Sequence, residues 1–195
     1  EQRDNTGGII DSAPIAGGNR LLTVPRSQLL DALRDACLDA DVEIVTHTEV
    51  TGANARGELF FAGGGMAAAD LAIGVDGVWS KVRESLGLER SHEQTVEGAL
   101  RTMVAAKPGD FGPDDHGKYI ECWNGARRFL VTPVNETQTY LALTCPDTDH
   151  EGRDIPVNHE SWSESFPYWT HLIERIGEVP VSWGVYSLTR CHARS

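Results

Sequence analysis

The sequence lacks three features that would direct its interpretation: a long apolar run, a CxxC pair of cysteines and an excess of basic residues. No run approaches the roughly 18 apolar residues of a transmembrane helix, so we expect a soluble protein without a membrane partner. The 29 acidic residues outnumber the 17 basic ones and give a net charge of −12. This charge repels phosphate backbones, which argues against nucleic acid and favours a small-molecule ligand.

Metal ligation and disulfides are also disfavoured by the pattern of residues. The four cysteines, Cys37, Cys122, Cys145 and Cys191, are irregularly spaced, and we interpret them as reduced, mostly buried thiols of a cytoplasmic protein. The seven histidines form no HExxH motif. The acidic segment 147–154 lacks the glycine and terminal glutamate of a calcium loop, so we predict a solvated loop and no metal site.

The first half of the chain mixes strand and helix patterns. Two β-like pieces, 7–15 and 20–24, are joined by the flexible segment 16–19. Apolar residues at helical spacing predict a helix over 25–39, with Pro25 at a position where a first-turn proline is tolerated. Strands are predicted for VEIVTHTEV (42–50) and for the apolar run before Asp76.

The second half reads as an antiparallel sheet with helices beside it. Long alternating segments separated by turn residues predict its strands: 95–106, 118–125, 127–134, 139–145 and 181–189. A helix is expected over 161–177, interrupted or entered at Pro167. The predicted fold class is α+β with an α/β portion, in which helices flank a mixed, largely antiparallel sheet.

The stretch ADLAIGVDGVWSKVRESLG, residues 69–87, places Asp76 and Gly77 between an apolar run and a short helix that Ser80 can cap. Ligands collect at such strand-to-helix turns, where glycine allows close approach to the backbone. The spacing alone favours an ordinary connecting turn.

The residues of this turn resemble the second fingerprint of the FAD-dependent aromatic hydroxylases, the single-component flavoprotein monooxygenases similar to p-hydroxybenzoate hydroxylase. The matching positions in LAIGVDGVWSKVR are Asp76, Gly77, Ser80 and Arg83. About fifty residues earlier, VPRSQLLDAL resembles the Arg-x-x-Leu-x-x-x-Leu helix start of the same family, beginning at Arg26.

The resemblance implies an enzyme that binds FAD, uses NADH or NADPH as co-substrate, and hydroxylates a small aromatic substrate with oxygen through a flavin hydroperoxide. Arg26 would reach the FAD, and Asp76 would lie beside its pyrophosphate. No protein nucleophile is required, and the sequence identifies no catalytic residue. Residues that alternate on strands placed over the flavin are the predicted substrate-pocket residues: Arg101, Met103, Trp123 and Leu130.

By the resemblance, residues 25–90 form part of an FAD-binding domain, and 1–24 with 91–190 form a substrate-binding domain. Residues 191–195 return toward the FAD-binding domain. The GxGxxG and Gly-Asp fingerprints of the family are not in the sequence, so we expect a central portion of a longer enzyme. A non-redox binding module and a related flavoprotein reductase or halogenase are the alternatives, and a homo-oligomeric state is left open.

Overall fold

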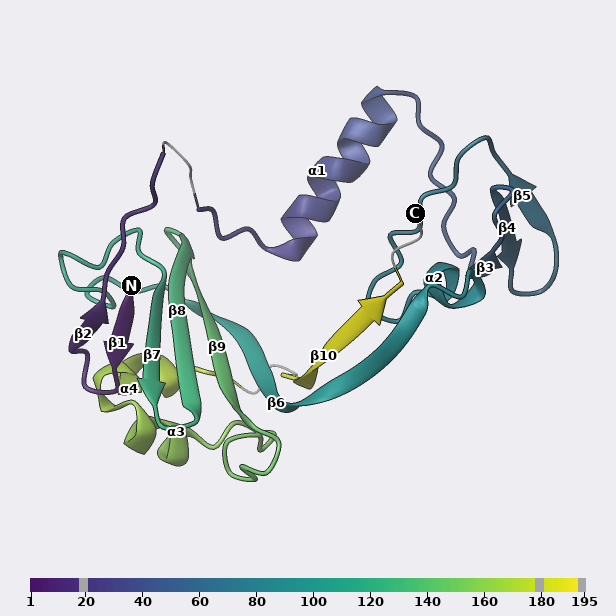
Figure 1. Cartoon of the computed structure of the whole chain (residues 1–195). Coiled ribbons are helices and arrows are strands. Elements are labelled where there is room, and N and C mark those ends of the chain that lie inside the picture. The colour runs from purple at the N-terminus through teal and green to yellow at the C-terminus, as the bar shows by residue number, and fades with distance from the viewer. Residues whose placement is uncertain (18–20, 178–180, 193–195) are drawn as a thin grey trace. The chain divides into compact units, whose positions relative to one another are not determined.

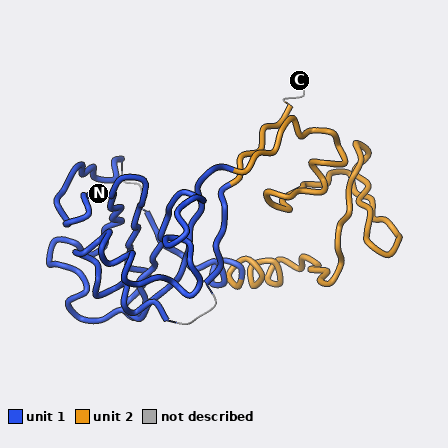
Figure 2. The backbone as a smooth tube through the Cα atoms, turned by 90° about the horizontal axis from the view of Figure 1, so that it is seen from below, with its two compact units in different colours: residues 1–30, 95–186 blue, residues 31–94, 187–195 orange. Residues whose placement is uncertain are grey.

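The chain divides into two compact units, which Figure 2 distinguishes by colour. The computed structural model describes residues 1–17, 21–177 and 181–192. Unit 1 comprises residues 1–30 and 95–186, and unit 2 comprises residues 31–94 and 187–195. This division is close in extent to the predicted one, while the roles of the two parts stay a prediction. Of the predicted returning segment 191–195, residues 193–195 lie outside the described chain.

Unit 1 is built on a mixed sheet of seven strands in the order β10-β6-β9-β8-β7-β1-β2, two of which continue into unit 2 (Figure 1). The strands are β1 (Gln2–Asp4), β2 (Ile9–Asp11), β6 (Glu89–Ala105), β7 (Ile120–Asn124), β8 (Arg127–Asn135), β9 (Gln138–Pro146) and β10 (Trp183–Cys191). Strands β6, β9, β8 and β7 pair antiparallel in succession, and β1 pairs parallel with β7. The predicted mixed, largely antiparallel sheet is confirmed.

One face of this sheet is covered by α3 (His159–Ser165), the 3-10 turn η1 (Pro167–Trp169) and α4 (Thr170–Ile173) (Figure 1). Pro167 opens the 3-10 turn, as expected for a residue that cannot continue a helix. The core between the layers is aromatic. The rings of Trp162 and Phe166 are stacked with their centres 6.0 Å apart, and the ring centre of Phe129 of β8 lies 5.7 Å from that of Phe166. Burial of these large rings is the main favourable contribution to folding of unit 1.

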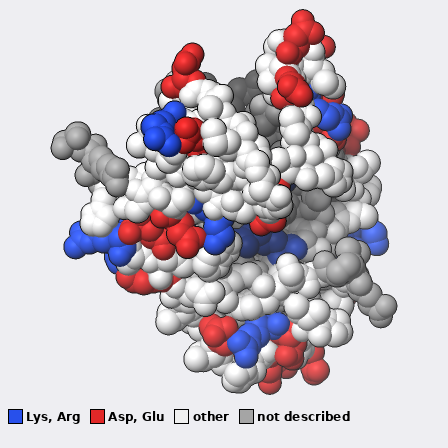
Figure 3. All heavy atoms as spheres, turned by 90° about the vertical axis from the view of Figure 1, so that its right-hand side faces the viewer, with Lys and Arg blue, Asp and Glu red and all other residues white. Residues whose placement is uncertain are grey.

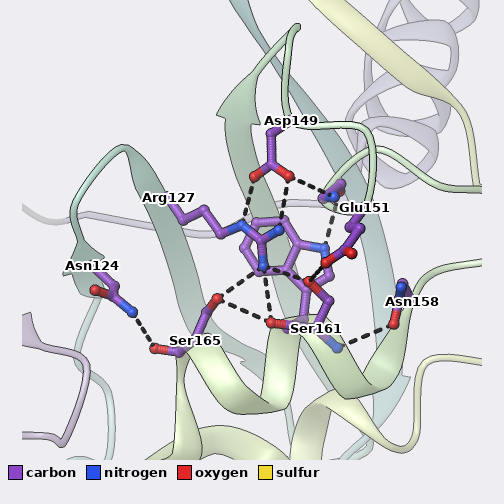
Figure 4. A network of polar contacts seen from close by, with 9 residues as sticks. Asn124, Arg127, Asp149, Glu151, Asn158, Ser161 and Ser165 are labelled. Atoms are coloured by element: carbon purple, nitrogen blue, oxygen red, sulfur yellow. Dashed lines mark hydrogen bonds and ion pairs between the residues drawn. The ribbon is translucent and has the colours of Figure 1, made fainter.

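A network of polar contacts at Arg127 ties the acidic loop and α3 to the sheet (Figure 4). Arg127 makes a bidentate ion pair with Asp149, at 2.6 and 2.8 Å, and donates to the carbonyl and hydroxyl of Ser161. Its guanidinium also lies 4.9 Å from the centre of the Trp162 ring. The expectation of a solvated loop is therefore wrong at Asp149, because this carboxylate forms an ion pair with Arg127, the first residue of β8.

Unit 2 holds a three-stranded antiparallel sheet of β3 (Val50–Ala53), β4 (Glu58–Phe61) and β5 (Met66–Ala68). The short helix α2 (Lys81–Ser85) docks on β3, where the Ser85 hydroxyl accepts a hydrogen bond of 2.8 Å from the Ala53 N–H. Helix α1 (Arg26–Asp39) begins in unit 1 and confirms the helix predicted over 25–39.

Three predicted strands do not form. Only Val50 of the segment 42–50 belongs to a strand, and residues 21–24 and 71–75 have none; Arg20 lies outside the described residues. Leu71, Ile73 and Val75 are 74, 75 and 88 % exposed. Their apolar pattern suits a central strand, but a strand forms only by pairing, and no neighbour among the described residues supplies the hydrogen bonds.

None of the helices in the described part of the chain is both long enough and apolar enough to cross a membrane. On the face drawn in Figure 3, acidic and basic side chains lie in small mixed groups separated by uncharged surface.

Replacing Arg127 by Ala is expected to lower the free energy of unfolding by about 2 to 4 kcal/mol, because Asp149 and Ser161 lose their shared partner. Urea titration followed by tryptophan fluorescence measures the loss. The ion pair lowers the pKa of Asp149, chiefly through its hydrogen bond from Arg127, so this stabilisation is present above the ordinary aspartate pKa. It should disappear as the pH falls through the lowered value.

The matched control is Arg153→Ala, which removes an ion pair to Asp147 whose side chains are 35 and 49 % exposed. Such a pair is worth at most about 1 kcal/mol. Equal losses in the two variants would show that the Arg127 network does not hold the loop and α3 in place.

The chain of residues 1–195, prepared alone, is expected to self-associate as its concentration rises, because apolar segments such as 71–75 and the leucines of α1 are exposed. Sedimentation velocity over a concentration series measures this. The double variant Ile73→Lys/Val75→Lys should associate less. A wild-type chain that stays monomeric at every concentration would contradict the expectation.

Candidate functional site

The Asp–Gly turn of unit 2 is closed by hydrogen bonds among its own residues. The carboxylate of Asp76 accepts from the Ser80 hydroxyl at 2.5 Å and from the Val82 N–H at 3.1 Å. Ser80 is 7 % exposed and caps α2, its hydroxyl oxygen accepting from the Arg83 N–H at 2.9 Å. The hydrogen bond from Ser80 is the main cause of a lowered pKa at Asp76, which therefore stays ionised at neutral pH.

Arg83 fastens the other side of the same turn. Its guanidinium donates to the carbonyl oxygens of Gly77 at 3.3 Å and Val78 at 2.5 Å, and to the carboxylate of Glu89 at 3.1 Å. The structure thus brings the predicted residues Asp76, Ser80 and Arg83 together. Their side chains form hydrogen bonds with one another and with backbone groups of the turn and of α2.

Gly77 has open space at its Cα, while its carbonyl oxygen accepts hydrogen bonds from the Arg83 guanidinium and the Ser80 N–H. Its φ of +84° lies in the region that disfavours side chains, and a Cβ built there would meet no atom within 4 Å. By contrast, a Cβ at Gly74 would lie 2.7 Å from Cγ1 of Val82, so that glycine is needed for close packing of α2. The backbone at Gly77 is therefore rigidly held yet open to a ligand.

Arg26 stands at the first position of α1, where its side chain is exposed. Among the described residues, none lies within ion-pair distance of its guanidinium. It is a cation available to an anionic ligand, and its relation to the Asp–Gly turn is not determined because the two lie in different units.

A cavity of about 340 Å³ lies on the face of the unit 1 sheet that the helices leave open. Its polar lining is dominated by Arg101, Arg128, Tyr119, Tyr140 and Tyr186, so we call it the arginine–tyrosine cavity. The pairing register explains the grouping, since residues directly opposite on neighbouring strands share a face.

The middle of the cavity floor is formed by small and apolar side chains, within a row of paired residues that crosses the sheet. Arg101 of β6 pairs with Ala142 of β9, which pairs with Leu130 of β8, which pairs with Glu121 of β7. The row therefore has the cation of Arg101 at one end and the carboxylate of Glu121 at the other. A flat ring can lie on the aliphatic side chains between them.

The two arginines of the cavity differ in their partners. Arg128 is engaged, with an ion pair of 2.7 Å to Glu97 and its guanidinium 5.1 Å from the Trp123 ring centre. Arg101 lies 5.2 Å from the Tyr186 ring centre, and no carboxylate among the described residues is within ion-pair distance of it. Arg101 is therefore the positive charge that the cavity keeps available.

Tyr119 and Tyr140 are held in their neutral form. Burial raises the pKa of Tyr140, an effect that nearby Arg101 partly offsets, and burial also raises the pKa of Tyr119. Both phenols therefore keep their protons at neutral pH and can donate hydrogen bonds to a ligand oxygen.

Of the predicted pocket residues, Arg101 and Leu130 line this cavity. Met103, opposite Tyr140, and Trp123, opposite Arg128, lie on the same face of the sheet but outside the lining. Sequence reasoning missed Arg128 and the three tyrosines. Alternation along β8 could have identified Arg128, which stands two residues before Leu130.

In chain order, the Asp–Gly turn precedes the antiparallel sheet and its open-faced cavity, which is the arrangement expected of a FAD-dependent hydroxylase. Comparison with known protein families agrees with this class. Residues 10–183 match the family described as FAD binding domain, and the chain belongs to that family.

Two curated relatives share about a third of their aligned residues with the chain. A "Probable 2-heptyl-3-hydroxy-4(1H)-quinolone synthase AqdB2" of Rhodococcus erythropolis is 34 % identical over 172 residues, which are 88 % of this chain and 45 % of the relative. The 2-heptyl-3-hydroxy-4(1H)-quinolone synthase of Mycobacteroides abscessus is 31 % identical over 175 residues, 89 % of this chain and 47 % of the relative. The chain spans about half the length of these relatives.

A solved structure supports the same relationship. The tetrameric form of 2-methyl-3-hydroxypyridine-5-carboxylic acid oxygenase matches with a TM-score of 0.79 and 30 % identity, covering 86 % of this chain and 46 % of that one. The α+β architecture is thus that of a flavoprotein oxygenase.

Within unit 2, the backbone at Gly77 leaves room for the close approach of a phosphate group, and within unit 1, Arg26 is an exposed cation without an ion pair among the described residues. The carboxylate of Asp76 is already bonded to Ser80 and Val82. A direct contact of Asp76 with the pyrophosphate stays a prediction.

Replacing Asp76 by Ala is expected to loosen the turn, because the Ser80 hydroxyl and the Val82 N–H both lose their acceptor. Loss of hydrogen bonds to a charged group costs about 1.5 to 3 kcal/mol, so amide hydrogens of residues 77–83 should exchange at least tenfold faster. Mass spectrometry of the peptide covering this segment measures the rate. Asp76→Asn, which keeps one acceptor oxygen, should show a smaller change; wild-type exchange in Asp76→Ala would mean that the carboxylate does not organise the turn.

Proposed function

We propose that the whole protein is an FAD-dependent monooxygenase that uses NAD(P)H and oxygen to hydroxylate a small aromatic substrate. The observation that carries this proposal is the arginine–tyrosine cavity, with its one unpaired cation, on the open face of the sheet in a chain of the FAD binding domain family. Its free thiols, two of them buried, are consistent with the cytoplasmic location that we also propose.

The substrate class that fits the cavity is an aromatic heterocycle with an anionic or readily ionised oxygen substituent. The guanidinium of Arg101, which has no carboxylate partner among the described residues, pairs with such an oxygen, and the neutral phenols of Tyr140 and Tyr119 donate hydrogen bonds to it. The relatives named above are a quinolone synthase and a hydroxypyridine carboxylic acid oxygenase, whose names describe nitrogen heterocycles with oxygen substituents. We infer a related ring for this protein.

The residues of the cavity would position and activate this ring. Leu130 and Ala142 supply a flat apolar floor, and Arg101 stabilises negative charge on the ring oxygen. An ionised oxygen substituent makes the ring electron-rich, which favours its attack on an electrophilic oxygen. Arg128, held by Glu97 and Trp123, contributes fixed positive potential.

The cofactor would be held by the residues of the fingerprints. Gly77 offers its backbone to the pyrophosphate, with Asp76, Ser80 and Arg83 keeping the turn in shape, and Arg26 supplies positive charge. When bound, FAD supplies the redox chemistry, taking electrons from NAD(P)H and activating oxygen. Choice between NADH and NADPH, and assembly as a homo-oligomer, belong to the same proposal for the whole protein.

The test is to load the whole protein with FAD and measure NAD(P)H oxidation while hydroxypyridine carboxylates and 4-quinolones are added. Stimulated oxidation together with a product that has gained one oxygen atom by mass spectrometry is expected. Arg101→Ala should raise the KM for an anionic substrate about 10- to 100-fold, the cost of one charge-assisted hydrogen bond. Arg101→Lys should recover part of this loss.

The matched control is Arg190→Ala, which removes an exposed arginine paired with Glu93. It should leave KM unchanged. Ligand binding without NAD(P)H oxidation would favour a non-redox binding module, and oxidation without oxygen transfer would favour a reductase. Either result would overturn the monooxygenase assignment.

A further inference from the structure

We propose that a second cavity in unit 1 receives an unbranched alkyl substituent of the substrate ring, an inference that rests on the proposed function. This cavity, of about 670 Å³, is lined largely by aliphatic residues, so we call it the apolar cavity. The residues that carry the argument are Pro14, Ile15, Leu21, Leu22, Pro133 and Val134.

The apolar cavity adjoins the arginine–tyrosine cavity. Tyr119 lines both of them. Along β8, Leu130 lines the first cavity, whereas Thr132 and Val134 line the second. Leu130 and Thr132 are two residues apart and point to the same face. The pairing of β8 with β9 is irregular between Pro133 and Asn135, and there Pro133 and Val134 both line the apolar cavity.

The distance along this path suits a chain attached to the ring. A strand rises about 3.3 Å per residue, so the four residues from Leu130 to Val134 span roughly 13 Å. That span exceeds the reach of a single ring and matches an extended chain of several methylene groups. A ligand seated over Leu130 with an alkyl substituent directed along β8 would occupy both cavities.

Two of the polar contacts in the apolar cavity are already made within the protein. Lys118 Nζ is 2.7 Å from a carboxylate oxygen of Glu1, and the hydroxyls of Thr23 and Thr132 are 3.2 Å apart. These contacts engage the lysine charge and both threonine hydroxyls. The remaining surface includes exposed aliphatic side chains, Leu21 and Leu22 among them, which gain by contact with a hydrocarbon chain and offer it no competing charge.

The two cavities thus differ in the side chains that line them. An arginine and tyrosines line the cavity proposed for the ring, and aliphatic residues line the cavity proposed for its alkyl substituent. Burial of one methylene is worth about a fourfold change in affinity. Chain length should therefore control binding strongly until the apolar cavity is filled.

The test is equilibrium binding of 2-alkyl-4-quinolones, from methyl to nonyl, to the FAD-loaded whole protein, followed by flavin fluorescence. The wild type should bind about three- to fourfold more tightly for each added methylene over the first several members. Val134→Trp, which fills the apolar cavity, should abolish this dependence while binding of the 2-methyl compound stays within twofold. The control Val96→Trp, at an exposed position outside both linings, should retain the wild-type dependence.

A second variant, Leu22→Asp, places a charge at an exposed position of the lining and should weaken the heptyl compound at least tenfold without affecting the methyl one. If the methyl compound binds but affinity does not change with chain length, the alkyl assignment is wrong and the proposed ring site stands. If no member of the series binds, both the quinolone-like ring and the alkyl assignment are overturned. Decanoate that binds without competing with the heptyl compound would identify an independent fatty-acid site and overturn the proposal.

Discussion

The packing of the aromatic helical layer against one face of the seven-stranded sheet is the constraint on which the rest of unit 1 depends. Trp162, Phe166 and Trp169 are essentially fully buried against Phe129 and its neighbours, so the helices are committed to that face. The opposite face keeps its alternate side chains free. Because side chains alternate between the two faces of a strand, the same packing that forms the core also determines which strand residues line the arginine–tyrosine cavity.

The polar elements of the chain serve this arrangement in two different ways. Arg127 binds Asp149 and Ser161 and so joins a loop and a helix to the sheet. Arg101 lies on the other face of the sheet and has no carboxylate partner among the described residues. Arg101 is exposed, so water solvates its charge and the guanidinium is accessible to an anionic ligand. This contrast separates a structural cation from a candidate binding cation.

The Asp–Gly turn likewise has structural side chains and a separate position for a ligand. Its side chains bind one another and the turn's own carbonyl groups, and only the glycine backbone is left open. A fingerprint of Asp, Gly, Ser and Arg can therefore be required by a ligand even if few of its side chains contact that ligand, since the shape of the backbone depends on them.

The sequence by itself determined the helix that begins at Arg26, the alternation of β6 to β9 and the spacing of the two fingerprints, because each depends on residues close together in the chain. Together with the family resemblance, it predicted Arg101 and Leu130 as pocket residues. The tertiary structure decided that 71–75 forms no strand among the described residues, that Asp76 is bonded to Ser80, and that Tyr119, Tyr140 and Tyr186 converge on Arg101. These outcomes depend on strand pairing and register between distant segments, and hydrogen bonds across a sheet are set by the partner strand, which no local pattern specifies.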